Sequence, residues 1–130
     1  MTVLVGYVPS PLGEAALRAA IEQARFREEP ILVVNTSRGD AYADPRLAQE
    51  DDLERVTREL TAAGVPHSMR QLVRGKDAAE EIEEIVEAED VSLVVIGIRH
   101  RTPVGKLIMG SAAQEILLRV PCPVLAVKAG

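Results

Sequence analysis

The chain has 130 residues, of which 47% are hydrophobic but only three are aromatic, and its 20 acidic and 15 basic residues give a formal net charge of −5. This length suits one domain, predicted over residues 1–130, that buries roughly two thirds of its unfolded surface. The negative charge argues against nucleic acid and anionic membranes as partners, and no apolar run approaches the roughly 20 residues of a membrane-spanning helix. The first residues lack the basic segment of a signal peptide, and the lone Cys122 excludes an internal disulfide, so we expect a cytoplasmic protein.

The first part of the chain predicts a strand, a helix and a second strand. Residues 2–8 are a short apolar run. Ser10 is a typical N-cap and Pro11 a typical first helical residue, and apolar residues at helical spacing follow. Pro30 ends that pattern, and residues 31–34 form the next apolar run.

The middle of the chain predicts a further helix and strand. A polar connection at residues 36–45 precedes an apolar helical face that Gly64 ends. Residues 65–73 alternate only weakly, which favours a strand near an edge of the sheet.

The third helix pattern begins with a capping box formed by Asp77 and Glu80. Its polar face is expected to be solvated and carries six glutamates, at positions 80, 81, 83, 84, 87 and 89. Residues 91–96 are almost continuously apolar, as is typical of a strand buried on both faces of a parallel sheet. A last strand is predicted from Val124 to Val127.

The stretch between Asp90 and Glu115 contains no carboxylate, although the chain as a whole is acidic. It holds four basic or imidazole side chains, Arg99, His100, Arg101 and Lys106, before Gly110 and Ser111 open a helix with a second capping box that ends at Gln114. Main-chain N–H groups at a helix start, next to fixed positive charge, form an anion site whose usual ligand is phosphate. The alternative to an anion site is that Gly110 and Ser111 only cap the helix and that the basic side chains lie in a solvated loop.

Alternating strand and helix patterns predict an α/β fold, a five-stranded parallel sheet with helices on both faces, in a Rossmann-like arrangement. Ligands of such sheets bind beyond the carboxyl ends of the strands, where strand order reverses. If the first and fourth strands are neighbours, the loops at residues 8–10 and 97–109 meet in one crevice.

Over nearly its whole length the chain resembles the universal stress protein family. The family signature is Gly, two residues, Gly, nine residues, then Gly-Ser or Gly-Thr. Gly97 and Gly110-Ser111 match its start and end at the same spacing, and residues 121–128 are similar to the family's terminal strand. The resemblance implies a fold like that of the adenine nucleotide alpha hydrolases.

The resemblance also implies a nucleotide site. Main-chain N–H groups and a hydroxyl would hold ribose and phosphates, the main chain near the end of the second strand would face adenine, and an arginine would pair with phosphate. The residues predicted to form this site are Gly97, Gly110, Ser111, Ala112, Val33, Arg99 and Arg101.

Two positions depart from the family pattern. His100 stands at the second glycine of the signature, and Val8 stands where an Asp usually follows the first strand. Losing a hydrogen bond to a charged group costs roughly ten- to hundredfold in affinity, and an arginine–phosphate pair contributes a similar amount. The sequence leaves the balance between the two effects open.

Three functions follow, in order of preference. The first is a non-enzymatic stress-response regulatory domain that binds ATP or AMP. Mg²⁺ is a further candidate ligand, because Asp40 or Asp44 would help to hold a metal beside the phosphate. The simpler interpretation of these two aspartates is that they are polar loop residues. The second is an interaction module that binds no nucleotide, its crevice filled by Val8 and His100. A homodimer through the edge strand from Val124 to Val127 is expected in both cases. The third is a weak ATPase, for which the sequence offers no catalytic residues.

Overall fold

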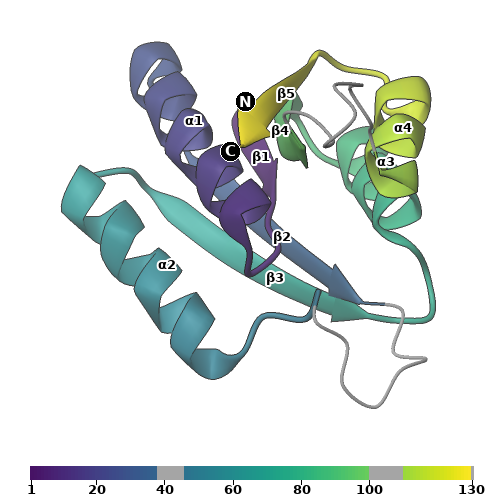
Figure 1. Ribbon diagram of the computed structural model, residues 1–130. Helices are drawn as coiled ribbons and strands as arrows, with labels where there is room; N and C mark the ends of the chain where they lie inside the picture. The colour runs from purple at the N-terminus through teal and green to yellow at the C-terminus, as the bar shows by residue number, and fades with distance from the viewer. Residues whose placement is uncertain (38–45, 100–109, 130) are drawn as a thin grey trace.

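The computed structural model describes residues 1–37, 46–99 and 110–129, in which strands and helices alternate (Figure 1). In chain order the elements are β1 (Thr2–Gly6), α1 (Pro11–Arg27), β2 (Ile31–Ser37), α2 (Glu50–Ala63), β3 (His67–Val73), α3 (Ala78–Ala88), β4 (Val91–Arg99), α4 (Ser111–Arg119) and β5 (Val124–Ala129). This alternation confirms the predicted α/β class.

The five strands form one parallel sheet in the order β3-β2-β1-β4-β5. The predicted parallel sheet and the edge position of β3 are therefore confirmed. β1 lies at the centre, where Val5 pairs with Val33 of β2 on one side and with Val95 of β4 on the other. Because β1 and β4 are neighbours, their carboxyl ends lie side by side at the edge of the sheet where the strand order reverses. The loop predicted at residues 97–109 lies mostly outside the described residues.

Helices cover both faces of the sheet, as predicted (Figure 1). Val3 and Val5 pack in a core layer with residues of α1 and α2, whereas Leu4 packs in the opposite layer with residues of α3 and α4. In β4 both Val94 and Val95 are completely buried, so this strand is enclosed from both sides. Within the described ranges, no helix is both long and apolar enough to cross a membrane.

Side-chain caps explain where two helices begin. The Gly13 N–H donates to Ser10 Oγ at 3.4 Å, which caps α1 just before Pro11. The Glu80 N–H donates to Asp77 Oδ1 at 2.9 Å, which caps α3. The N-cap residues Ser10 and Asp77 agree with the sequence patterns, and at α3 this bond is the Asp77 half of the predicted capping box.

The second predicted capping box is wrong. Gly110 is the N-cap of α4, with extended backbone, and its carbonyl accepts the Gln114 N–H at 3.1 Å. Ser111 is therefore already the first helical residue. The pattern misplaced the cap by one residue because glycine also caps helices well without a side chain.

The prediction of a fully solvated glutamate face on α3 is wrong at Glu81, which is completely buried. Arg74 donates to both of its carboxylate oxygens, at 2.5 and 3.1 Å. A buried carboxylate is tolerated when a guanidinium pairs with it in this two-bond geometry. Since Arg74 directly follows β3, the pair fixes the β3–α3 connection to α3.

Candidate functional site

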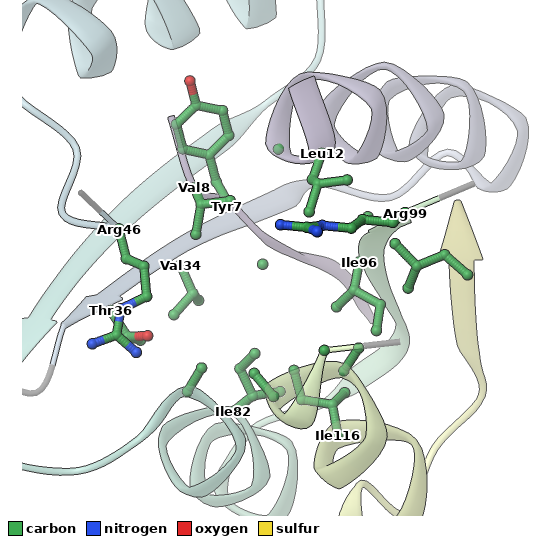
Figure 2. A pocket seen from close by; sticks show the side chains of 18 residues that line it. Tyr7, Val8, Leu12, Val34, Thr36, Arg46, Ile82, Ile96, Arg99 and Ile116 are labelled. Atoms are coloured by element: carbon green, nitrogen blue, oxygen red, sulfur yellow. The ribbon is translucent and has the colours of Figure 1, made fainter. Parts of the chain in front are cut away.

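A cavity of about 390 Å³ opens at the carboxyl edge of the sheet (Figure 2). It lies where β1 and β4 adjoin, and its walls come from the ends of β1, β2 and β4 and the first turns of α1, α3 and α4. This is the position predicted for a ligand in a parallel sheet of this kind.

Most of the cavity wall is aliphatic. Ile82 of α3, Ile96 of β4 and Ile116 of α4 line one side, and Val34 of β2 lies across from them (Figure 2). Val8 also lines the cavity, and it forms part of the wall rather than filling the space. His100, the other residue expected to fill the crevice, lies outside the described residues.

Three helices begin beside the cavity. Gly13 in the first turn of α1, Ala78 at the start of α3 and Ala112 in the first turn of α4 all line it. The first N–H groups of a helix have no partner within the helix, and the helix dipole adds partial positive charge at this end. Ser10 and Asp77 already cap α1 and α3, but in the described chain α4 has no side-chain cap and no acidic residue in its first turn. The start of α4 is therefore the part of the cavity best suited to an anionic group.

Two arginines add full positive charge. Arg99 at the end of β4 and Arg46 beside Thr36 of β2 both line the cavity (Figure 2). Arg99 reaches the carboxyl edge because β4 extends past the predicted apolar run. No carboxylate, histidine or cysteine lines the cavity in the part of the chain that the structure describes.

Glycines allow the start of α1 to pack closely around the cavity. A Cβ added at Gly13 would lie 1.8 Å from the Val8 carbonyl oxygen, and one at Gly97 would lie 2.1 Å from the Leu12 carbonyl oxygen. Both distances are far shorter than any real contact, so packing alone requires glycine at these positions.

Gly110 differs from Gly97. Its φ is −66°, which other residues adopt freely, and a Cβ there would meet no atom of the described residues within 4 Å. In the described chain, therefore, neither backbone conformation nor packing requires glycine at the cap of α4.

Tyr7 belongs to the cavity wall, but its hydroxyl points away from the cavity (Figure 2). The hydroxyl donates to Glu14 Oε1 at 2.7 Å, and Arg55 of α2 donates to the same oxygen at 2.5 Å and to the Tyr7 hydroxyl at 3.2 Å. Burial, followed by the hydrogen bond to Glu14, raises the pKa of Tyr7 to about 12. Tyr7 thus stays protonated at neutral pH and joins β1, α1 and α2.

The structure brings most of the predicted site residues together. Gly97, Arg99, Gly110 and Ala112 line the cavity, whereas Ser111 is exposed beside it. The Val33 side chain is buried in the opposite core layer, under α1 and α2, while its neighbours Val34 and Thr36 line the cavity. Arg101 lies outside the described residues.

Sequence reasoning missed the residues that the fold brings in from other elements. They include Leu12 and Ile82, which read as ordinary core positions, and Arg46, which follows a polar connection without any motif. The general rule that first helical turns and strand ends line such a site would have identified Leu12 and Ala78.

A metal centre finds no support in the described ranges, which contain no group of three or more His, Cys, Asp or Glu side chains placed to hold an ion. Asp40 and Asp44, the candidate metal ligands, lie outside these ranges.

Comparisons with known proteins agree with this architecture. A universal stress protein of Mycolicibacterium smegmatis is 48% identical over 126 residues, which cover 97% of this chain and 96% of the relative. A solved universal stress protein from Archaeoglobus fulgidus superposes with a TM-score of 0.85 at 32% identity, covering 98% of each chain. A second structure from that organism, in complex with dAMP, gives a TM-score of 0.77 at 27% identity, also covering 98% of each chain.

The model of the universal stress protein family matches residues 1–128. Together with the close relative, this match shows that the chain belongs to the universal stress protein family.

Proposed function

We propose that this chain is a non-enzymatic regulatory domain that binds an adenine nucleotide, ATP or AMP, in the cavity between the segments that follow β1 and β4. The observation that carries the proposal is that Arg99 and the start of α4, which no side chain of the described residues caps, line one aliphatic cavity. Its volume of about 390 Å³ lies within the range of small-molecule sites. The relative from Archaeoglobus fulgidus that is in complex with dAMP supports a mononucleotide as the ligand.

The two ends of a nucleotide suit different parts of this cavity. Phosphate suits the start of α4, because Gly110 and Ala112 line the same cavity as Arg99. The base suits the aliphatic space toward β2, between Val34 and Ile82. The described lining offers Mg²⁺ no carboxylate, so Arg99 and main-chain N–H groups would hold the phosphate.

Binding without catalysis is the better proposal for the same cavity. Hydrolysis needs a group that takes a proton from water near neutral pH. Tyr7, whose pKa is raised to about 12, does not meet this need, and the rest of the described wall is aliphatic, cationic or hydroxylic. A weak ATPase ranks last, and phosphate release above that of a Ser111→Ala control would support it.

Isothermal titration with AMP, ATP and cyclic AMP tests the proposal. We expect binding of at least one of them, with a rise in melting temperature as the ligand stabilises the folded chain. Absence of both heat and thermal shift at millimolar ligand would contradict the proposal.

A homodimer is the second part of the proposal, and without nucleotide binding it becomes the alternative function. β5 is the last strand of the sheet, beside β4, and its side chains from Val124 to Val127 are only half-buried. Leu118 of the neighbouring α4 is 86% exposed. An apolar edge strand is suited to pairing with a second copy. Sedimentation at micromolar concentration should show a dimer, and a monomer alone would count against this part.

A further inference from the structure

A buried asparagine on β2 ties together three segments beside the cavity. Asn35 is 1% exposed. Its Nδ2 donates to the Tyr7 carbonyl at 2.9 Å and to the Arg46 carbonyl at 2.8 Å, and its Oδ1 accepts the Ala48 N–H at 2.9 Å. Gln71 of β3 donates to the same Oδ1 at 3.0 Å and to the Ala48 carbonyl at 2.8 Å. Asn35 thus holds the end of β1 and the chain that leads into α2.

The partners of Asn35 fix the orientation of its amide. Carbonyl groups only accept and a main-chain N–H only donates, so the oxygen must face Ala48 and the nitrogen must face Tyr7 and Arg46. Both donors and both acceptor positions of the amide are used. The bonds to Tyr7 and Ala48 are the costliest to lose, because each is buried and its main-chain partner would be left unpaired there.

Arg46 is the residue that this network places at the cavity. Its side chain lines the wall beside Thr36, at the carboxyl end of β2 (Figure 2). Arg99 lines the wall at the end of β4. Because β1 separates β2 from β4 in the sheet, the two strands are roughly 10 Å apart. Arg46 and Arg99 therefore face different parts of the cavity.

We infer that Arg46 contacts the base of the bound nucleotide and that Asn35 is the positioning residue that holds Arg46 there. The inference rests on the proposed function, in which phosphate takes the side of α4 and Arg99 and leaves the β2 side to the base. A guanidinium group is planar, stacks on aromatic rings and donates N–H bonds to acceptor atoms of a base. Its five N–H donors allow Arg46 to keep protein partners and still contact the ligand.

AMP and adenosine separate the roles of the two arginines, because they differ only in the phosphate. Arg46→Gln should weaken both ligands by the same factor, about tenfold or more, since the lost contact is with the base. Arg99→Gln should weaken AMP by a similar factor and leave adenosine unchanged. Arg25→Gln is the matched control: it removes the same charge in the last turn of α1, roughly 20 Å along the helix from Leu12, and should alter neither affinity. Isothermal titration measures all three.

A double-variant cycle tests the positioning role. Asn35→Ala should weaken adenosine in the natural chain but cost little further affinity once Arg46→Gln is present, because both changes remove the same contact. If Asn35→Ala does not fold, Asn35→Asp takes its place: it keeps an acceptor for the Ala48 N–H and loses the donations to Tyr7 and Arg46. Adenosine is the ligand here because it is uncharged and does not respond to the added carboxylate.

The outcomes are distinct. If Arg46→Gln loses AMP and keeps adenosine, Arg46 meets the phosphate and the inference is overturned. Additive losses in the cycle would overturn the positioning role of Asn35. A natural chain that binds neither ligand contradicts the proposed function, and the inference falls with it.

Discussion

The carbonyl oxygen of Leu12 occupies the space that a side chain at Gly97 would need, since a Cβ there would lie 2.1 Å from it. The start of α1 consequently packs directly on β4. This contact brings the first turn of α1 to the cavity, which the end of β4 also lines. Gly97, which the family resemblance assigns to the ligand, is therefore also a packing residue, and fold and cavity depend on the same contact.

Gly97→Ala should destabilise the protein whether or not a ligand is present. The added methyl group meets main chain, which cannot move aside as a side chain can, so β4 and α1 must separate. Overpacking of this kind costs about 1–3 kcal/mol. Urea denaturation without ligand measures the loss, and an unchanged midpoint would show that the contact between Leu12 and Gly97 is not tight in solution.

Gly110→Val should give the opposite pattern, a loss of nucleotide binding with little loss of stability. A side chain at this position meets no described atom within 4 Å and needs no unusual backbone conformation, and a poorer helix cap costs only about 1 kcal/mol. The valine would project where a phosphate is expected to approach the start of α4. Titration with AMP and thermal denaturation of the same samples test both halves. Unchanged binding would place the phosphate elsewhere.

The sequence predicted the elements well because each one carries a local signal. Ser10 and Asp77 cap their helices as expected, and the nearly continuous apolar run at 91–96 is buried from both sides. The order of the strands has no such signal: the pairing of Val5 with Val95 joins residues that are distant in sequence. The prediction that the loops at residues 8–10 and 97–109 meet was for this reason conditional on the order of the strands.

The site and the buried Glu81 were harder to predict because they depend on contacts that the sequence pattern does not show. Glu81 resembles its exposed glutamate neighbours in sequence, and only the fold brings Arg74 against it. Gly97 matches a ligand motif, but the close approach of Leu12 that requires glycine there is a long-range contact. Arg46 follows a polar connection with no motif, and its place at the cavity depends on Asn35. Spacing in the sequence does not reveal such contacts.

Arg74→Ala should destabilise the protein more than Arg70→Ala, although both remove one arginine from an ion pair. The partner of Arg74, Glu81, has an exposed side-chain fraction of 0%, whereas Glu89, the partner of Arg70, is 43% exposed. Water can replace the lost arginine at Glu89 but not at Glu81. Urea denaturation compares the two variants.

Adding Glu81→Gln to Arg74→Ala provides the control. A neutral amide is less costly to bury than an unpaired carboxylate, so the second change should recover part of the lost stability. Equal destabilisation by Arg74→Ala and Arg70→Ala, with no recovery, would mean that Glu81 reaches water.

Tyr7 should make stability depend on pH in the alkaline range. Its pKa in the folded chain is about 12, against an ordinary value of 10.0, because burial and the hydrogen bond to Glu14 favour the neutral phenol. Between these two values the unfolded chain releases the proton while the folded chain keeps it. The stabilising contribution is therefore complete below pH 10 and is lost as the pH rises through 12.

Tyr7→Phe isolates this effect, since phenylalanine keeps the ring in the core and cannot ionise. At neutral pH the variant should lose about 1 kcal/mol through the missing hydrogen bond to Glu14. The rest of the chain is identical in the two proteins, so only the difference between their free energies of unfolding reports on Tyr7. That difference should shrink as the pH rises above 10, because the natural chain alone loses the contribution. If the free energies of unfolding of the two proteins run parallel above pH 10, the Tyr7 hydroxyl is more exposed to water than it is in the structure.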